Sequence, residues 1–294
     1  MAYRHPELPE PQLRPLLDAY GTQAATRRRT TLLGIVLLVA ALVVSAMGAE
    51  VRLDTLWDQL GNFGSYFGRL TQLDTGARVW TDPFSWFWGW RRWSLQLGQT
   101  LLIAYVATVT GAALGLVGGV LASRNVSPNP AVRFVALRVC EFDRTVPDIV
   151  FALIFVVAFG LGPLPGVLAI TLHTAGTLGK LLAEVIENID IKPVEGVLAT
   201  GGNWLAQIRF GVLPQVLPNF ASYALLRLEI NVRGAAVVGF VGAGGIGQEL
   251  IVAIRKFYYS DVSAILLMLL ACVVAIDFAS ERMRSRLQAM ERQG

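Results

Sequence analysis

Residues 187–218 read ENIDIKPVEGVLATGGNWLAQIRFGVLPQVLP and lie between two long apolar stretches. Pro193 suits the first turn of a helix, because a missing N–H costs nothing there. We expect a short helix over residues 195–199, a break at Gly201 and a second helix over residues 204–210. The segment therefore predicts a compact helix–turn–helix knob between two spans. Its expected apolar face consists of Trp204, Leu205 and Ile208.

The remainder of the chain is rich in apolar residues and poor in charge. Of its 294 residues, 54% are hydrophobic and 16% are charged, whereas soluble domains carry about a quarter charged residues. A bilayer core of ~30 Å requires about 20 apolar residues of helix. We therefore expect an all-α membrane protein with about six transmembrane helices, at residues 31–49, 95–121, 146–162, 165–187, 213–238 and 260–280.

Two of these spans carry further expectations. The third is expected to continue a helix that begins near Ala131 and is kinked at Pro147. The first is expected to be a retained span rather than a cleaved signal peptide, because a long polar segment precedes it.

The distribution of basic residues predicts the orientation. Cytoplasmic loops of membrane proteins are enriched in Lys and Arg. Most of the Lys and Arg residues outside the spans fall in four alternate segments, which are residues 1–30, 122–145, 188–212 and 281–294. Both termini and the knob are therefore expected to be cytoplasmic. The long outer loop holds five indoles expected at the membrane interface, with ligand stacking as the alternative: Trp80, Trp86, Trp88, Trp90 and Trp93.

The fifth span carries polar side chains that are costly in lipid. It contains Arg227, Glu229, Asn231 and Arg233, and such groups usually face a protein interior or a wet cavity. Glu229 and Arg233 have the spacing of a helical ion pair. Arg227 is then left to bind an anion in a translocation pathway, or alternatively to cap carbonyls or pair with another helix. His173 in the fourth span is either a satisfied structural group or a residue that contacts the substrate.

Glycines mark two further places. Gly111, Gly115 and Gly119 share one face of the second span and predict close packing against another helix, or a sliding surface. The stretch from Gly242 through Gly244 and Gly245 to residue 247 matches G-x-G-x-x-G. A dinucleotide site requires a preceding strand, whereas a membrane span precedes this stretch. We instead expect irregular backbone at membrane depth, close to the pathway.

Sequence motifs of enzymes and metal sites are missing. There is no Walker A sequence, no H-E-x-x-H, no cysteine cluster and no G-x-S-x-G. Cys140 and Cys272 are expected to act as small apolar residues rather than as a disulfide. Neither a metal site nor a nucleic-acid partner is expected.

The knob resembles the cytoplasmic loop of permeases from binding-protein-dependent ABC importers. That loop has the pattern E-A-A, three residues, G, nine residues, I-x-L-P. Four positions fall on this register: Glu195, Gly201, Leu213 and Pro214. Three positions depart from it: Gly196 and Val197 replace the alanines, and Gly211 replaces the isoleucine. Residues 144–163, 172–187 and 211–250 look like the permease of phosphonate and phosphate importers in particular.

The resemblance implies a type I ABC importer permease fold with cytoplasmic coupling helices. It implies a core permease domain over residues 95–280, preceded by an N-terminal tail, a first transmembrane helix and a Trp-rich extracytoplasmic segment over 1–94, and followed by a cytoplasmic tail over 281–294. The loop residues implied to couple to an ATPase are Glu195, Gly201, Trp204, Leu213 and Pro214. The residues assigned to the pathway are Arg227, Glu229, Asn231, Arg233, Gly242, Gly244, Gly245 and His173.

The implied partners are a second copy of the chain, two ATP-binding subunits that hold ATP and Mg, and an extracytoplasmic phosphonate- or phosphate-binding protein. No cofactor is expected in this chain, which would lie in the lipid of the inner membrane. Two alternatives remain: a permease for another solute such as an amino acid, and a stand-alone secondary transporter. The latter would require an inverted repeat and a carboxylate relay, which the sequence does not suggest.

Overall fold

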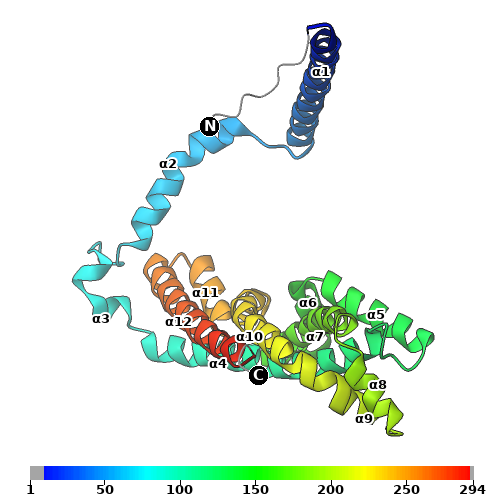
Figure 1. Ribbon diagram of the computed structural model, residues 1–294. Coiled ribbons are helices and arrows are strands. Elements are labelled where there is room, and N and C mark those ends of the chain that lie inside the picture. Colours follow the sequence, from blue (N-terminus) through cyan, green and yellow to red (C-terminus); the bar gives the residue numbers. More distant parts are fainter. Residues whose placement is uncertain (1–9, 292–294) are drawn as a thin grey trace, which may run out of the picture. The chain divides into compact units, whose positions relative to one another are not determined.

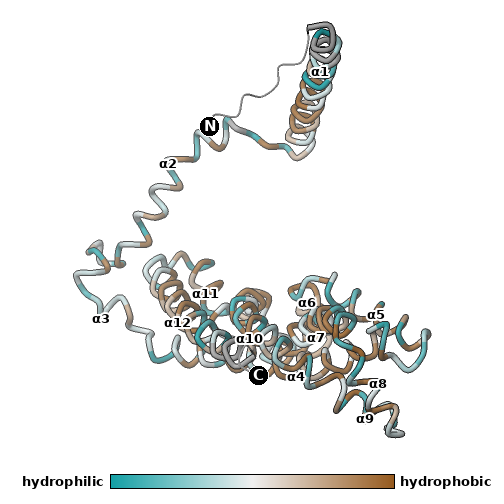
Figure 2. Tube along the Cα trace, in the orientation of Figure 1, coloured by the Kyte–Doolittle hydropathy of each residue, from teal (hydrophilic) through white to brown (hydrophobic). Residues whose placement is uncertain are grey.

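The computed structural model describes residues 10–291, and helices dominate that range, which contains no β-strand. The chain divides into two compact units, Met1–Ser65 and Tyr66–Gly294. The first unit contains α1 (Glu10–Gly48) and most of α2 (Leu53–Leu70). In Figure 2, the later part of α1 is coloured as strongly hydrophobic. This apolar part covers Thr26–Gly48 and includes all of the predicted first span, residues 31–49, except its last residue.

The second unit contains the remaining elements, which Figure 1 labels. They are η1 (Val79–Thr81), α3 (Pro83–Trp86), α4 (Trp90–Ala122), α5 (Pro130–Thr145), α6 (Asp148–Phe159), α7 (Pro163–Glu187), α8 (Lys192–Ala199), α9 (Trp204–Ala206), η2 (Gln207–Val212), α10 (Leu213–Val238), η3 (Gly239–Val241), α11 (Ile246–Arg255) and α12 (Tyr259–Glu291). Figure 1 shows α5, α6 and α7 grouped together, and α10, α11 and α12 forming a neighbouring group.

Several helices are long and apolar enough to cross a membrane. Among the described residues there are four, Thr26–Gly48, Trp90–Ala122, Pro163–Glu187 and Tyr259–Ser285, and a fifth if the bent pair Trp204–Val241 and Ile246–Arg255 counts as one span. The expected fifth span coincides with α10. The expected third span corresponds to α6, which has 12 residues and would reach only about 18 Å by itself.

The break before α6 was also expected. Helix α5 begins at Pro130, capped by the Asn129 side chain, and ends at Thr145. After Val146, the chain resumes as α6 directly beyond Pro147. A proline lacks the N–H that would continue the helical hydrogen bonds. The prediction of a kinked helix therefore corresponds to two short helices in succession.

Three glycines of α4 lie directly against α7: Gly111, Gly115 and Gly119. A Cβ atom on Gly111 would lie 2.7 Å from the Cβ of Thr174, and one on Gly119 would lie 2.8 Å from the Cβ of Leu182. Real Cβ atoms do not approach neighbours so closely, so only glycine allows this separation between the helices. The prediction of a packing face is confirmed, and it places α4 and α7 together at the centre of the second unit.

Replacing Gly111 with leucine is expected to destabilise the unit by roughly 1–3 kcal/mol, because α4 and α7 must separate to admit the side chain. Gly98 of the same helix is the matched control, since no atom of residues 10–291 outside its own stretch of helix backbone lies within 4 Å of a Cβ placed there. Thermal unfolding of the detergent-solubilised variants measures the difference. Equal stability of the two leucine variants would contradict the packing described here.

Candidate functional site

The helix–turn–helix knob, defined here as residues 192–212, has the predicted order of elements with different boundaries. Helix α8 begins three residues earlier than expected, at Lys192. Gly201 follows it with a φ of +78°, a left-handed conformation that favours glycine. Helix α9 then begins at Trp204, where the Asn203 side chain accepts a hydrogen bond from the Ala206 N–H at 2.9 Å.

The second helix of the knob is mostly a π-helix, which was not expected. Only Trp204–Ala206 is α-helical, and Gln207–Val212 forms the π-helical turn that runs directly into α10. Pro214 has no N–H to donate to the carbonyl four residues earlier. The N–H of Leu213 instead bonds to the carbonyl of Ile208, five residues back. The two residues of the Leu-Pro signature thus sit where the helix returns to α-helical geometry.

Gly211 allows the two arms of the knob to touch. A Cβ atom on Gly211 would lie 2.9 Å from the Cα of Val194 and 3.2 Å from its nitrogen. These are backbone atoms, so they cannot rotate out of the way as a flexible side chain could. The departure from isoleucine at this position therefore has a physical reason, which is the direct backbone contact between α8 and the π-helix.

The knob is fixed firmly to the helices above it. The Trp204 indole N–H donates to the carbonyl of Val126 at 2.8 Å. The Gln215 amide donates to the carbonyl of Asp190 at 3.1 Å, and its oxygen accepts from the Asp190 N–H at 3.2 Å. Val194 and Val212 are buried in a core shared with α4, α7 and α10. A displacement of the knob would thus be transmitted to these helices.

The outward surface of the knob differs from the predicted apolar face. Ile208 is buried and Trp204 is half-buried, so both belong to the internal contact. Leu205 alone of the three is exposed, at 66%. The exposed apolar side chains of the knob also include Leu198 and Phe210. Glu195 lies exposed near the start of α8. The three predicted apolar residues are thus divided between the internal contact and the exposed surface.

The charged side chains of α10 form a network with α12. Arg233 and Glu229 pair at 2.7 Å with the predicted spacing of four residues. Arg284 of α12 also approaches Glu229, at 3.4 Å, and Asp277 lies 3.9 Å from Arg233. Glu229 is largely buried, so these contacts satisfy a carboxylate that would otherwise be costly. The two partners on α12 were not predicted, although Asp277 is a carboxylate within the predicted last span and such a residue needs a partner.

Arg227 takes no part in this network. Within residues 10–291, its buried Nε atom has no hydrogen-bond partner. The acidic group in its neighbourhood is the carboxylate of Asp148, at the start of α6. The same carboxylate lies 3.1 Å from the position of a Cβ on Gly234, two helical turns along α10. The guanidinium thus keeps hydrogen-bonding capacity beside one acidic group.

Asn231 and His173 both make contacts inside the chain. Asn231 is 3% exposed, and its amide nitrogen donates to the hydroxyls of Thr108 at 2.8 Å and Thr174 at 2.9 Å. It therefore links α10 to α4 and α7. The Nδ1 atom of His173 lies 3.2 Å from the carbonyl oxygen of Val146. That carbonyl precedes the break at Pro147, so the imidazole meets a group that the broken helix leaves available.

The glycine loop between α10 and α11 is irregular, as expected, and buried. Gly242, Gly244 and Gly245 have φ values of +90°, +83° and +77°. Side chains of α4 satisfy the start of α11: the Gln99 carbonyl oxygen accepts from the Gly245 N–H at 3.1 Å, and the Thr100 hydroxyl accepts from the Ile246 N–H at 2.8 Å. Irregular backbone at membrane depth is stable only with such internal partners.

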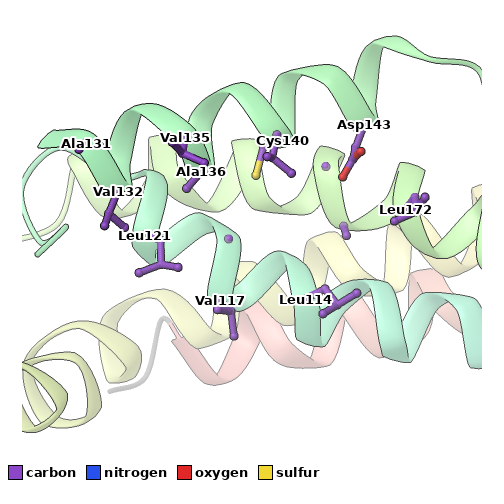
Figure 3. A pocket seen from close by; sticks show the side chains of 14 residues that line it. Leu114, Val117, Leu121, Ala131, Val132, Val135, Ala136, Cys140, Asp143 and Leu172 are labelled. Carbon is purple, nitrogen blue, oxygen red and sulfur yellow. The ribbon is translucent and has the colours of Figure 1, made fainter. Parts of the chain in front are cut away.

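A groove of 710 Å³ lies between α4, α5 and α7 (Figure 3). Leucine, valine and alanine side chains line most of it, and its one charged lining residue among those described is Asp143. An apolar wall with a carboxylate does not suit an anion. The groove is therefore separate from the polar residues of α10.

Comparison with known proteins identifies this arrangement. Residues 115–289 match the family model described as the binding-protein-dependent transport system inner membrane component. The match covers more than half of the chain and includes the knob, α10 and the glycine loop.

The chain belongs to this family.

Individual relatives agree with the family match. The phosphite transport system permease protein PtxC of Stutzerimonas stutzeri is 42% identical over 202 residues, which are 69% of this chain and 74% of that protein. The phosphate-import permease protein PhnE of Mycolicibacterium smegmatis is 40% identical over 64% of this chain, although only 36% of that longer protein is matched. A putative cryptic phosphonate permease, PhnE2 of Escherichia coli, is 51% identical over 40% of this chain and 96% of its own length.

Solved structures show the same fold. An inward-facing structure of the MetNI methionine ABC transporter aligns with a TM-score of 0.58 and 23% identity, covering 70% of this chain and 98% of the compared chain. The expected type I importer permease fold is confirmed. The chain is a multi-pass membrane permease subunit of an ABC importer, and it is a transport subunit rather than an enzyme.

Proposed function

We propose that this permease carries a phosphorus oxyanion, phosphonate or phosphate, across the inner membrane. The observation that carries the proposal concerns the guanidinium of Arg227 in α10, which is partly buried. Within residues 10–291, its Nε atom has no hydrogen-bond partner. A planar guanidinium matches the oxygens of a phosphoryl group. The names of the three relatives, which refer to phosphite, phosphate and phosphonate, support the same class of cargo.

The pathway would run along the polar side of α10. Arg227 would meet the oxyanion, and Asp148 would neutralise the guanidinium when no cargo is bound. Glu229 and Arg233 would hold α10 against α12, and Asn231 would hold it against α4 and α7. His173, Gly242, Gly244 and Gly245 would form the adjoining walls, where two copies of the chain meet.

The knob would couple this pathway to ATP hydrolysis. Two ATP-binding subunits, which hold ATP and Mg, would dock below the membrane against Glu195 and the exposed apolar side chains. Gly201, Trp204, Leu213 and Pro214 would keep the knob rigid and attached. Both termini would be cytoplasmic, and an extracytoplasmic binding protein would deliver the cargo. ATP binding would then open the cavity outward, and hydrolysis would reverse it.

The decisive experiment measures ATP hydrolysis by the reconstituted complex with its binding protein. Inorganic phosphate and 2-aminoethylphosphonate are added separately, with methionine as a control ligand. We expect one of the two phosphorus compounds to stimulate hydrolysis and the amino acid to have no effect. Stimulation by methionine alone would overturn the cargo assignment while leaving the permease class intact.

Replacing Arg227 with glutamine is expected to reduce oxyanion uptake by roughly 10- to 100-fold, because a hydrogen bond to a charged group contributes about 1.5–3 kcal/mol. Glutamine retains donors but loses the charge. Arg255→Gln, at the exposed end of α11, is the control and should transport normally. Unchanged uptake by the Arg227→Gln permease would remove Arg227 from the pathway.

Replacing Glu195 with alanine is expected to lower ligand-stimulated ATP hydrolysis and uptake together, by roughly tenfold or more if this side chain is a docking hot spot. Glu184→Ala removes another exposed carboxylate, on α7, and should have little effect. Copurification of the ATP-binding subunits reports the docking directly. Full stimulated hydrolysis in the Glu195→Ala complex would argue strongly against the coupling role.

A further inference from the structure

Helix α2 (Leu53–Leu70) is strongly two-sided, although the sequence interpretation treated it only as part of an outer loop. Its apolar side chains recur every three or four residues, which places them on one face. They are exposed: Leu56 61%, Trp57 78%, Leu60 50%, Phe63 66% and Phe67 52%. The opposite face carries Asp54, Asp58, Gln59, Asn62 and Ser65. An apolar stripe of this length indicates a surface that water does not cover in the working protein.

The helix begins next to a membrane span. The apolar part of α1 ends at Gly48, and Glu50 then turns the chain with a φ of +53°. Four residues separate the two helices, and four extended residues reach at most about 14 Å. The first turn of α2 therefore lies close to the point where α1 leaves the bilayer.

The helix also ends next to a membrane span. The Tyr66 ring packs edge-on against Tyr259, with the ring centres 5.7 Å apart, and the Arg69 guanidinium lies 5.1 Å from the centre of the same Tyr259 ring. Tyr259 is the first residue of the span Tyr259–Ser285. The last turn of α2 is thus held at the boundary where α12 enters the bilayer.

Helix α2 is the connection between these two boundaries. A stretch of 18 residues is about 27 Å long as a helix, which is almost enough to cross. However, α2 carries Asp54, Asp58 and Arg69, and such charges on a lone span are strongly unfavourable in lipid. Because α2 does not cross, its apolar stripe requires another apolar environment, and each end of the helix lies beside a point where a span meets the membrane surface.

We propose that α2 lies flat on the bilayer, with its apolar stripe at the boundary between headgroups and acyl chains. An amphipathic helix binds a membrane surface in this way, and Trp57 has the side chain most typical of that depth. The two aspartates would be repelled by anionic lipid, so the charge of the helix fits a zwitterionic headgroup. The helix would brace the outer end of α12 against the membrane.

Spin labels along α2 test the orientation in the full-length permease. The labels are introduced at single cysteines, Leu56→Cys, Leu60→Cys, Asp58→Cys and Asn62→Cys, after the two native cysteines are replaced with alanine. The protein is reconstituted in phosphatidylcholine vesicles, and collisions with oxygen and with a water-soluble nickel complex are measured. We expect oxygen to dominate at positions 56 and 60, and nickel to dominate severalfold at positions 58 and 62.

A charge placed within the stripe provides the matched comparison. Leu60→Asp should raise nickel collisions of a label at position 56 severalfold, whereas Gln59→Asp adds the same charge to the polar face and should not. Dominance of nickel at all four positions would place α2 in water. Low collision rates with both reagents at positions 56 and 60 would mean that protein covers the stripe. Either outcome would overturn the proposal.

Discussion

Replacing Gly247 with alanine is expected to destabilise the permease by about 3 kcal/mol or more. The new methyl group would overlap the carbonyl oxygen of Ala236, which is backbone near the end of α10. It would also lie 3.2 Å from the Cα of Gly239. Neither atom can rotate away as a side chain would, so α11 must move off α10. The bent pair of helices α10 and α11 would then lose its close backbone contact at Gly247.

The effect can be measured by the yield of folded protein and by its thermal unfolding in detergent. Gly98→Ala in α4 is the control, because, apart from the adjacent backbone of α4, no atom of the described residues lies within 4 Å of the added methyl group. Alanine favours a helix over glycine by roughly 0.5–1 kcal/mol, so this control should be neutral or slightly stabilising. A Gly247→Ala permease as stable as the control would contradict the close contact between α10 and α11.

The helices of the core were predictable because hydrophobic run length and proline position are local signals. The expected fifth span and α10 share their boundaries, 213 and 238. The break at Pro147 and the pair Glu229–Arg233 follow from rules that involve neighbours within one turn. Such features need no knowledge of which helices meet.

Contacts between helices were the part that the sequence did not reveal. Asn231 was assigned to a pathway from its polarity, and only the fold places the hydroxyls of Thr108 and Thr174 around its amide. Arg284 lies beyond the predicted last span, yet α12 continues to Glu291 and brings it to Glu229. A polar residue in a span indicates an internal partner, whereas the identity of that partner depends on packing.

Helix α2 was overlooked for a different reason. Its spacing of apolar residues was visible, but interruption by Gly61, Gly64 and Gly68 lowers the helix propensity of the segment. A membrane span is indicated by a continuous run of apolar residues. The apolar residues of α2 are separated by polar ones, including Asp54 and Asp58, so no such run exists there. An amphipathic period needs its own test, separate from hydropathy.

Restoring the family isoleucine at Gly211 is expected to impair this permease. The side chain would enter the space held by the Cα and nitrogen of Val194, at 2.9 Å and 3.2 Å from the first added atom. Helix α8 must then tilt away from the π-helix, at a cost of roughly 1–3 kcal/mol. If the knob is the docking element, the tilt would move Glu195 and reduce ligand-stimulated ATP hydrolysis.

The matched change is Gly196→Ala, which restores a family alanine on α8. Beyond the adjacent backbone of α8, no atom in the described part of the chain lies within 4 Å of its Cβ, and alanine should stabilise the helix by roughly 0.5–1 kcal/mol. Both substitutions restore a residue of the family pattern, but they should change the stability of the permease in opposite directions. The side chain added at position 196 would point into open space, whereas the side chain added at position 211 would meet the backbone of α8. Ligand-stimulated ATP hydrolysis and thermal unfolding are measured for both variants. If the Gly211→Ile permease equals the Gly196→Ala permease in both measurements, then α8 does not depend on its backbone contact with Gly211.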